Sequence, residues 1–151
     1  MSITLNTTFK DPRTTIVLSI LIFLASTRRT ITYKELAEEV NYRILDPFYL
    51  GEEISVQEFP TEGRAMGNQV GECLYEVLEF CLKRNLPLLS ALVVRKSGEN
   101  KDLPGKGFWK YVVDNNIRQL NVNVYDQKAR TFKSFQKAIY NYYDPSLSYV
   151  G

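Results

Sequence analysis

The chain has 151 residues, of which 44% are hydrophobic and 24% are charged, and this composition is typical of one soluble globular domain. Its formal net charge of +2 is too small to indicate a polyanionic partner by itself, so any basic surface must come from local clustering of Lys and Arg. The chain contains no histidine, which excludes Ser-His-Asp catalysis, Cys-His catalysis and metal sites that use imidazole.

The two cysteines, Cys73 and Cys81, lie in one apolar stretch whose spacing is helical. On a helix they would be separated by about 11 Å of rise, which is beyond the reach of a disulfide. We therefore expect two small buried hydrophobic side chains and a reducing, cytoplasmic compartment. Two cysteines alone make a poor zinc site, so neither a metal nor another cofactor is expected.

The first predicted element is a helix over residues 11–29, DPRTTIVLSILIFLASTRR. Asp11 or Thr14 can cap its start, and Arg28 and Arg29 suit the negative end of the helix dipole. The apolar run within it is far shorter than the ~20 residues that a membrane span needs. It therefore predicts a buried core helix, and no membrane partner is expected.

A second, short helix is predicted from TITYKELAEEV. Thr32 followed by Glu35 matches the S/T-x-x-E capping box, so the helix is expected to begin near Tyr33. Residues 43–62 then contain Pro47, Gly51 and Pro60, and we interpret this stretch as an insertion. The alternation in EISVQEF within it is compatible with a short edge strand.

A long helix is predicted to begin in GRAMGNQVGE, residues 63–72. The helical core stripe comprises Met66, Val70, Cys73, Leu74, Val77 and Cys81. The basic residues, asparagine and proline of KRNLP predict where this helix ends.

The remaining elements follow from short apolar runs. LLSALVVRK predicts a buried strand, and the turn-rich SGENKDLPGKG predicts a loop. FWKYVVDNN is compatible with a helix or a strand, LNVNVY alternates as a strand does, and RTFKSFQKAIYNYY predicts a final helix.

This order predicts an α/β chain of the α+β type, built on a winged helix-turn-helix core. An insertion separates the second and third helices, and a strand and a helix extend the core at its C-terminal end. Residues 1–13 are expected to form an N-terminal arm, and residues 14–151 a single domain.

Three segments, in order, resemble the DNA-binding half of the O6-alkylguanine-DNA alkyltransferases: ITYKELAEEV, RAMGNQVG and NLPLLSALVVRKSG, within residues 30–98. The resemblance implies that Arg64 fills the gap left by a flipped base and that Tyr33 pushes on the phosphate of that nucleotide. The family's reaction needs a cysteine thiolate followed by a histidine. This chain has neither in SALVVRK, so alkyl transfer is not expected. The insertion is also longer than the family's usual connection.

The start of the long helix is the first candidate site. A helix N-terminus favours phosphate, and Arg64, Asn68 and Gln69 carry side chains that can make bidentate contacts to base edges. The alternative is that they are solvated residues of a structural helix. Tyr33 and Lys34 could contact a backbone phosphate, or Tyr33 could pack at the start of its helix.

A basic loop over residues 95–106 is the second candidate, with Arg95, Lys96, Lys101 and Lys106 placed as a wing on the DNA backbone. The alternative is an ordinary lysine-rich turn. GKG in this loop lacks the spacing of a phosphate-binding P-loop. Phe108 and Trp109 could stack on bases, although such a pair more often packs in the core.

These patterns predict a DNA-binding protein that is not an enzyme and whose partner is duplex DNA. The alternative is a protein-interaction module, a regulator or inhibitor that binds no DNA, acting as an oligomer or through a partner. Its contact surface would be the tyrosine-rich C-terminal helix, with Tyr140, Tyr142, Tyr143 and Tyr149. A third interpretation is a base-flipping sensor without catalysis.

Overall fold

The computed structural model describes residues 9–46, 56–97, 101–115 and 129–144, which form a mainly helical chain with one small parallel sheet. The elements in chain order are α1 (Arg13–Ser26), β1 (Ile31–Thr32), α2 (Tyr33–Ile44), α4 (Gly63–Lys83), the 3-10 helix η1 (Leu89–Leu92), β2 (Val93–Val94), α5 (Lys106–Asp114) and α6 (Ala129–Tyr143). The predicted α+β class is confirmed at this coarse level. The winged helix-turn-helix assignment is a finer statement and stays a prediction.

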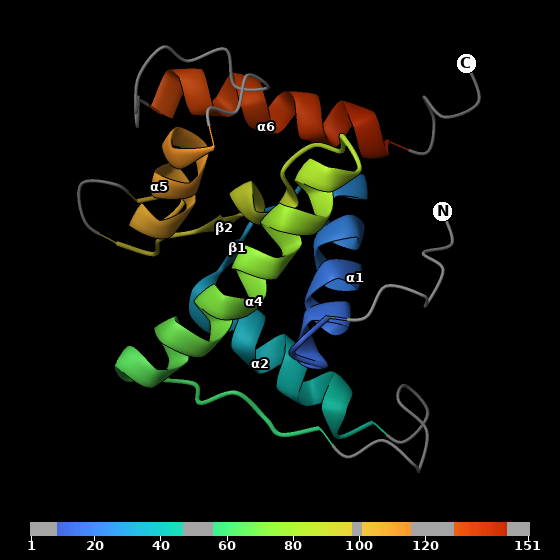
Figure 1. The fold of residues 1–151 in the computed structure, drawn as a ribbon, viewed down its shortest axis with the longest axis vertical. Coiled ribbons are helices and arrows are strands. Elements are labelled where there is room, and N and C mark those ends of the chain that lie inside the picture. Colours follow the sequence, from blue (N-terminus) through green and yellow to red (C-terminus); the bar gives the residue numbers. More distant parts are fainter. Residues whose placement is uncertain (1–8, 47–55, 98–100, 116–128, 145–151) are drawn as a thin grey trace.

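Helix α1 lies beside α4 and contacts α2, α4, α6 and η1 (Figure 1). Its apolar side chains point in nearly every direction, so most of its surface must be covered, although Phe23 stays 51% exposed. Its buried apolar residues are Ile16, Val17, Leu18, Ile20, Leu21, Leu24 and Ala25. The prediction of a buried core helix is therefore confirmed.

The ends of α1 differ from the prediction. The N-cap position is Pro12, which makes no side-chain cap bond. The carboxylate of Asp11, one residue before Pro12, accepts a hydrogen bond from the N–H of Arg13. The helix ends at Ser26, before the two arginines, so no basic residue lies in its last turn. Arg28 has a positive φ of 57° and instead forms an ion pair with Asp144 at 3.0 Å.

The capping box of α2 forms as predicted. The backbone N–H of Glu35 donates to the Thr32 hydroxyl, and the Glu35 carboxylate accepts from the Thr32 N–H. Just before this helix, β1 pairs in parallel with β2, with Ile31 opposite Val93. The sheet therefore ties the start of α2 to a segment 62 residues later, and this arrangement fixes where α2 begins in space.

Helix α4 crosses the face of the molecule and packs on α1, α2, α5 and η1 (Figure 1). It begins at Gly63 and ends at Lys83, as predicted, and Asn85 then adopts a left-handed φ of 53° that turns the chain. The predicted stripe is buried except at Met66, which is only half-buried.

Several short elements depart from the prediction. LLSALVVRK does not form one strand, because Leu89–Leu92 is a 3-10 helix and only Val93–Val94 is extended. The described part of EISVQEF, from Val56 onward, forms no strand. FWKYVVDNN is helical as far as Asp114, as one of its two interpretations held, and the final helix is confirmed. The predicted strand LNVNVY lies outside the described residues.

Candidate nucleic-acid interface

The first two turns of α4 are mostly exposed to solvent. Gly63, Arg64, Ala65, Gly67 and Asn68 are all exposed, whereas burial begins at Val70. The N-cap residue is Glu62, and its side chain makes no hydrogen bond with the N–H groups of the first turn. The predicted candidates Arg64 and Asn68 thus lie on an accessible helix start, where the dipole favours an anion.

Glycine keeps one side of this helix bare. A Cβ added at Gly63, Gly67 or Gly71 would meet no atom within 4 Å. Gly67 and Gly71 are four residues apart and so share one face of the helix. That face has room for a ligand, and packing within the described residues does not explain its glycines.

Lys34 lies beside the start of α4. Its ammonium group is 3.7 Å from the carboxylate of Glu62, and both side chains are largely exposed. An exposed ion pair of this length contributes little to stability. It does show that the predicted phosphate contact at Lys34 and the predicted base contact at Arg64 belong to one region.

Tyr33 is held from within the protein. Its phenol oxygen accepts a hydrogen bond from the N–H of Gly105 at 3.0 Å. Burial raises the pKa of Tyr33, and the Gly105 hydrogen bond and the charge of Arg95 oppose that rise only in part. The phenol therefore stays protonated at neutral pH and joins α2 to the turn before α5, a role that the sequence prediction of a phosphate contact did not include.

Gln69 does not join Arg64 and Asn68. Its side-chain oxygen accepts from the guanidinium of Arg13 at 2.9 Å, so it faces the N-terminal segment. Arg13 itself is 8% exposed and forms a bidentate pair with Asp11. Gln69 thus holds α4 against α1, and we remove it from the set of candidate base-reading residues.

The basic loop is described in part, because residues 98–100 fall outside the described ranges. Its ends are joined by backbone bonds, since the Arg95 N–H donates to the carbonyl of Leu103 and the Asp102 N–H donates to that of Arg95. Arg95 is half-buried, whereas the side chains of Lys96, Lys101 and Lys106 are exposed. Three of the four predicted basic residues are therefore accessible.

A cavity of about 240 Å³ lies between the glycine face of α4 and the turn at the start of α5. Its lining residues are Tyr33, Gly67, Gly71, Leu74, Tyr75, Leu78, Ser90, Gly105, Lys106, Gly107 and Phe108. No pattern in the sequence predicted this cavity. The glycine pair four residues apart in α4 is the only local signal that pointed to it.

The aromatic candidates are dispersed. Phe108 and Trp109 are buried, and the indole N–H of Trp109 donates to the carbonyl of Pro104 at 3.2 Å, so these rings pack in the core. In α6, Tyr142 is 52% exposed, whereas Tyr143 is buried and packs edge-on against it. Tyr140 is half-buried, and Tyr149 lies outside the described residues. Among the described tyrosines of α6, only Tyr142 offers an exposed ring.

The acidic side chains and the two thiols of the described residues do not form a metal site. No three His, Cys, Asp or Glu side chains there are placed to hold a metal ion. Cys73 and Cys81 are free thiols in the core. The hydroxyl of Ser90, in the SALVVRK segment, is buried and donates to the carbonyl of Leu74 at 2.8 Å. No helix among the described residues is long and apolar enough to cross a membrane.

Comparisons of the chain with protein-family models, with curated proteins and with solved structures found no match. The alkyltransferase resemblance therefore rests on the three sequence segments alone.

Proposed function

We propose that this protein binds duplex DNA without catalysing a reaction, and that the first two turns of α4 approach the groove in the manner of a winged helix-turn-helix. The observation that carries the proposal is the exposed, glycine-faced start of α4, with Arg64 and Asn68 on it and Lys34 beside it. Arginine and asparagine are the side chains that bind guanine and adenine edges in pairs of hydrogen bonds.

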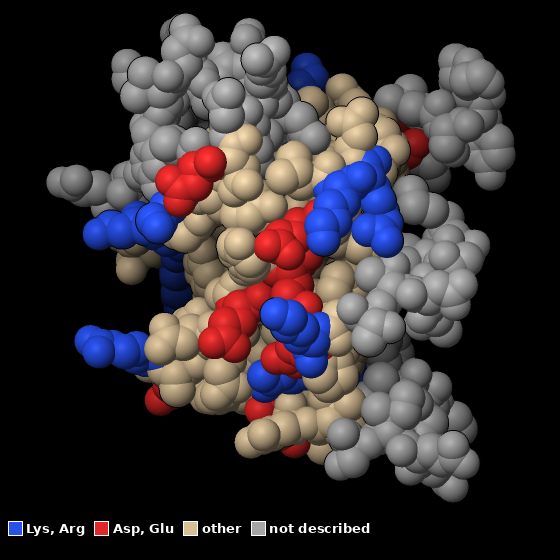
Figure 2. All heavy atoms as spheres, viewed as in Figure 1, with Lys and Arg blue, Asp and Glu red and all other residues tan. Residues whose placement is uncertain are grey.

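The charge along α4 supports this orientation. From Gly63 to Gly71 the helix carries one charged residue, Arg64. The carboxylates begin at Glu72, and Figure 2 shows acidic side chains gathered over the middle of the face that α4 crosses. Phosphate would be repelled there. The helix can therefore approach DNA with its first turns and not along its length.

The lysines of the loop add nonspecific affinity. Lys106 lines the cavity together with Gly67 and Gly71, so this side of the loop lies against the bare face of α4. Lysine on a phosphate fixes the register of a complex and carries no sequence information. Lys96, Lys101 and Lys106 are the backbone contacts in this proposal, and Arg64 and Asn68 are the base contacts.

The test is a fluorescence titration of a labelled duplex at low and moderate salt with the wild-type protein, Arg64→Ala and Lys83→Ala. Lys83 is the matched control, because it is an exposed cation at the opposite end of the same helix. We expect Arg64→Ala to weaken binding about tenfold and Lys83→Ala to change it little. Absence of binding at low salt, or equal affinity of Arg64→Ala and the wild type, would overturn the proposal.

A second candidate, a sensor of extruded bases, is favoured by the cavity of about 240 Å³ beside this helix start. The cavity combines a bare glycine face with the aromatic rings of Tyr33 and Phe108. Unpairing costs less at a mismatch, so such a sensor would prefer a mismatched duplex to an intact one. Equal affinity for the two duplexes rejects this candidate and leaves simple duplex binding in place.

A further inference from the structure

A second concave surface lies between the middle of α4 and the segment before α1, on the helix face next to the one that lines the cavity, and Tyr75 borders both. This groove has a volume of about 690 Å³. Its charged lining residues are Lys10, Asp11, Arg13, Glu72, Glu76 and Glu79. We refer to it as the acidic groove, and none of the DNA contacts proposed above belongs to it.

The groove has a surplus of negative charge. Four carboxylates line it against two basic side chains, which leaves a net charge of two negative units. The guanidinium of Arg13 is already occupied, because it binds Asp11 at 2.8 Å and Gln69 at 2.9 Å. Asp11 therefore matches most of its charge, and Arg13 acts on Glu72 only through a weaker charge interaction.

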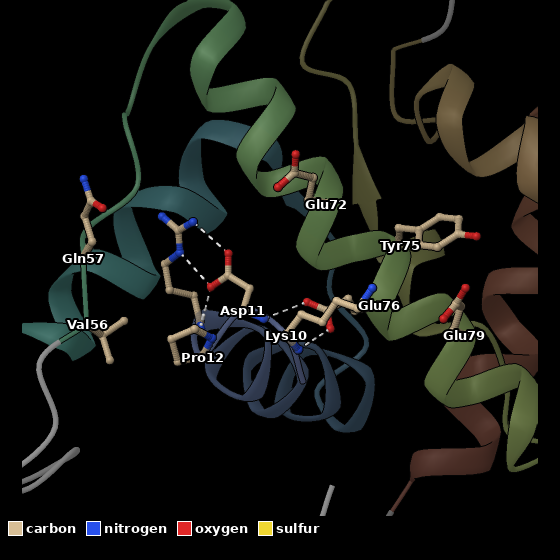
Figure 3. A pocket seen from close by; sticks show the side chains of 10 residues that line it. Lys10, Asp11, Pro12, Val56, Gln57, Glu72, Tyr75, Glu76 and Glu79 are labelled. Atoms are coloured by element: carbon tan, nitrogen blue, oxygen red, sulfur yellow. Dashed lines mark hydrogen bonds and ion pairs between the residues drawn. The ribbon is translucent and has the colours of Figure 1, made fainter. Parts of the chain in front are cut away.

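Glu76 is committed to the fold. Its carboxylate accepts hydrogen bonds from the N–H groups of Lys10 and Asp11 (Figure 3). It also accepts one from the hydroxyl of Thr14. Glu72 and Glu79 differ from it, because neither forms an ion pair among the described residues. They lie on either side of Glu76 along α4 and supply the unneutralised charge of the groove.

An exposed aromatic ring lies between these two carboxylates. Tyr75 is 51% exposed, and its ring packs edge-on against Tyr111 with 5.2 Å between the centroids. The nearby carboxylate of Glu79 stabilises the protonated phenol and so raises the pKa of Tyr75. An aromatic ring that is held in place and flanked by carboxylates is suited to a lysine or arginine side chain. The carboxylates attract the cation by charge, and the ring binds it by cation–π contact.

The chain's own neighbouring segments do not match this charge. Residues 1–8, MSITLNTT, contain no basic side chain, and residues 47–55, PFYLGEEIS, carry two glutamates and no cation. Charge complementarity therefore favours an occupant from outside this chain. The geometry points to an extended, basic segment of a partner protein, docked along α4 between Glu72 and Glu79.

The spacing of the two carboxylates defines the ligand more closely. Seven residues of helix separate them by about 10 Å along the axis. A segment in the extended polyproline II conformation rises about 3.1 Å per residue and has three residues per turn, so cations three residues apart lie on one side of it and about 9 Å apart. The expected motif is two Lys or Arg residues with two intervening residues.

The test uses fluorescein-labelled pools of degenerate decapeptides with lysine fixed at two positions three residues apart, and matched pools with glutamate there. Binding is measured by anisotropy for the full chain, for the Glu72→Gln and Glu79→Gln double variant, and for a Glu38→Gln and Asp114→Asn control. The control removes the same charge from exposed helix positions elsewhere. We expect the lysine pool to bind, the groove variant to lose about tenfold, and the control to lose less than about twofold.

Three outcomes would overturn the proposal: no binding of the lysine pool, equal losses in the two double variants, or equal binding of the lysine and glutamate pools. Sedimentation of the protein alone adds one more. A dimer that dissociates in salt and is lost in the groove variant would assign the groove to a second copy. Duplex titrations of the same variants distinguish a failure of this proposal from a failure of the DNA-binding proposal. The groove variant should retain the DNA binding that Arg64→Ala loses.

Discussion

The phenol oxygen of Tyr33 accepts a hydrogen bond from the backbone N–H of Gly105 at 3.0 Å, across 72 residues of sequence. The contact leaves no room for a side chain at position 105. A Cβ there would lie 2.6 Å from the same phenol oxygen, closer than real Cβ contacts occur. The bond therefore requires glycine because the backbone must approach the ring closely.

The first prediction tests this contact with Gly105→Ala. The new methyl group must displace the phenol or the turn, which breaks the hydrogen bond and strains the packing. We expect the free energy of unfolding to fall by about 1–3 kcal/mol. Urea unfolding followed by the fluorescence of the buried Trp109 gives the value.

Gly107→Ala is its matched control. Position 107 lies within α5, and a Cβ there meets no atom within 4 Å. Alanine is the better helix former, so this variant should be more stable by up to about 1 kcal/mol. Equal effects of the two substitutions would show that the Tyr33–Gly105 contact does not restrict position 105.

The features that the sequence predicts correctly are those that depend on residues close together in the chain. The capping box at Thr32 and Glu35 and the turn after Lys83 involve residues within a few positions of one another, and both are present in the structure. The pairing of Gln69 with Arg13 spans 56 residues and that of Tyr33 with Gly105 spans 72. Neither helical periodicity nor a capping pattern predicts a pairing between such distant residues. The sequence therefore predicts DNA contacts for Tyr33 and Gln69 and not these two pairings.

The second prediction concerns the segment that leads into α4. The amide of Asn41 donates to the carbonyl of Phe59 at 2.9 Å and accepts from its N–H at 2.7 Å, and both bonds are buried. Asn41→Ala leaves these two backbone groups without partners. We expect a loss of about 2–4 kcal/mol in the free energy of unfolding.

Hydrogen exchange supplies a local measurement for this variant. The Phe59 amide should be protected in the wild type and should exchange much faster in Asn41→Ala. The control is Asn68→Ala, an exposed position of α4 where a change within about 0.5 kcal/mol is expected. Similar losses at the two asparagines would contradict the structural role assigned to Asn41.

The third prediction is a pH dependence that comes from Asp11. Burial acts to raise the pKa of this carboxyl, but the hydrogen bonds and charge of Arg13 outweigh it, so the pKa is lowered from 3.8. A lowered folded-state pKa contributes stability that is present above the unfolded value. That contribution is lost as the pH falls through the folded value.

Asp11→Asn removes this contribution. At pH 7 the variant should be less stable than the wild type by about 1–3 kcal/mol, because Arg13 keeps its charge and loses its partner. The difference should shrink below about pH 4 as Asp11 takes up its proton. Urea unfolding of the two proteins between pH 7 and pH 3 checks this. A difference that stays constant across that range would rule out the ion pair as its source.

The short apolar run before the basic loop shows a different limit of sequence analysis. Leu89–Leu92 and Val93–Val94 are buried throughout, and burial removes the alternation by which a strand is distinguished from a helical turn. The conformation is set by packing, since η1 contacts α1, α4 and α6. The cavity was missed for a related reason, because its walls come from α2, α4 and the start of α5.

The last prediction concerns the two thiols. Burial raises the pKa of Cys73 to about 12 and that of Cys81 to about 11, so neither forms an appreciable amount of thiolate at pH 8. Both side chains have no exposed surface. Labelling by a disulfide reagent at pH 8 should therefore require opening of the structure and should be at least about a hundredfold slower than in denaturant. Cys73→Ala and Cys81→Ala assign each kinetic phase to one thiol, and rapid labelling of either in the native protein would show that its part of α4 is not packed as described.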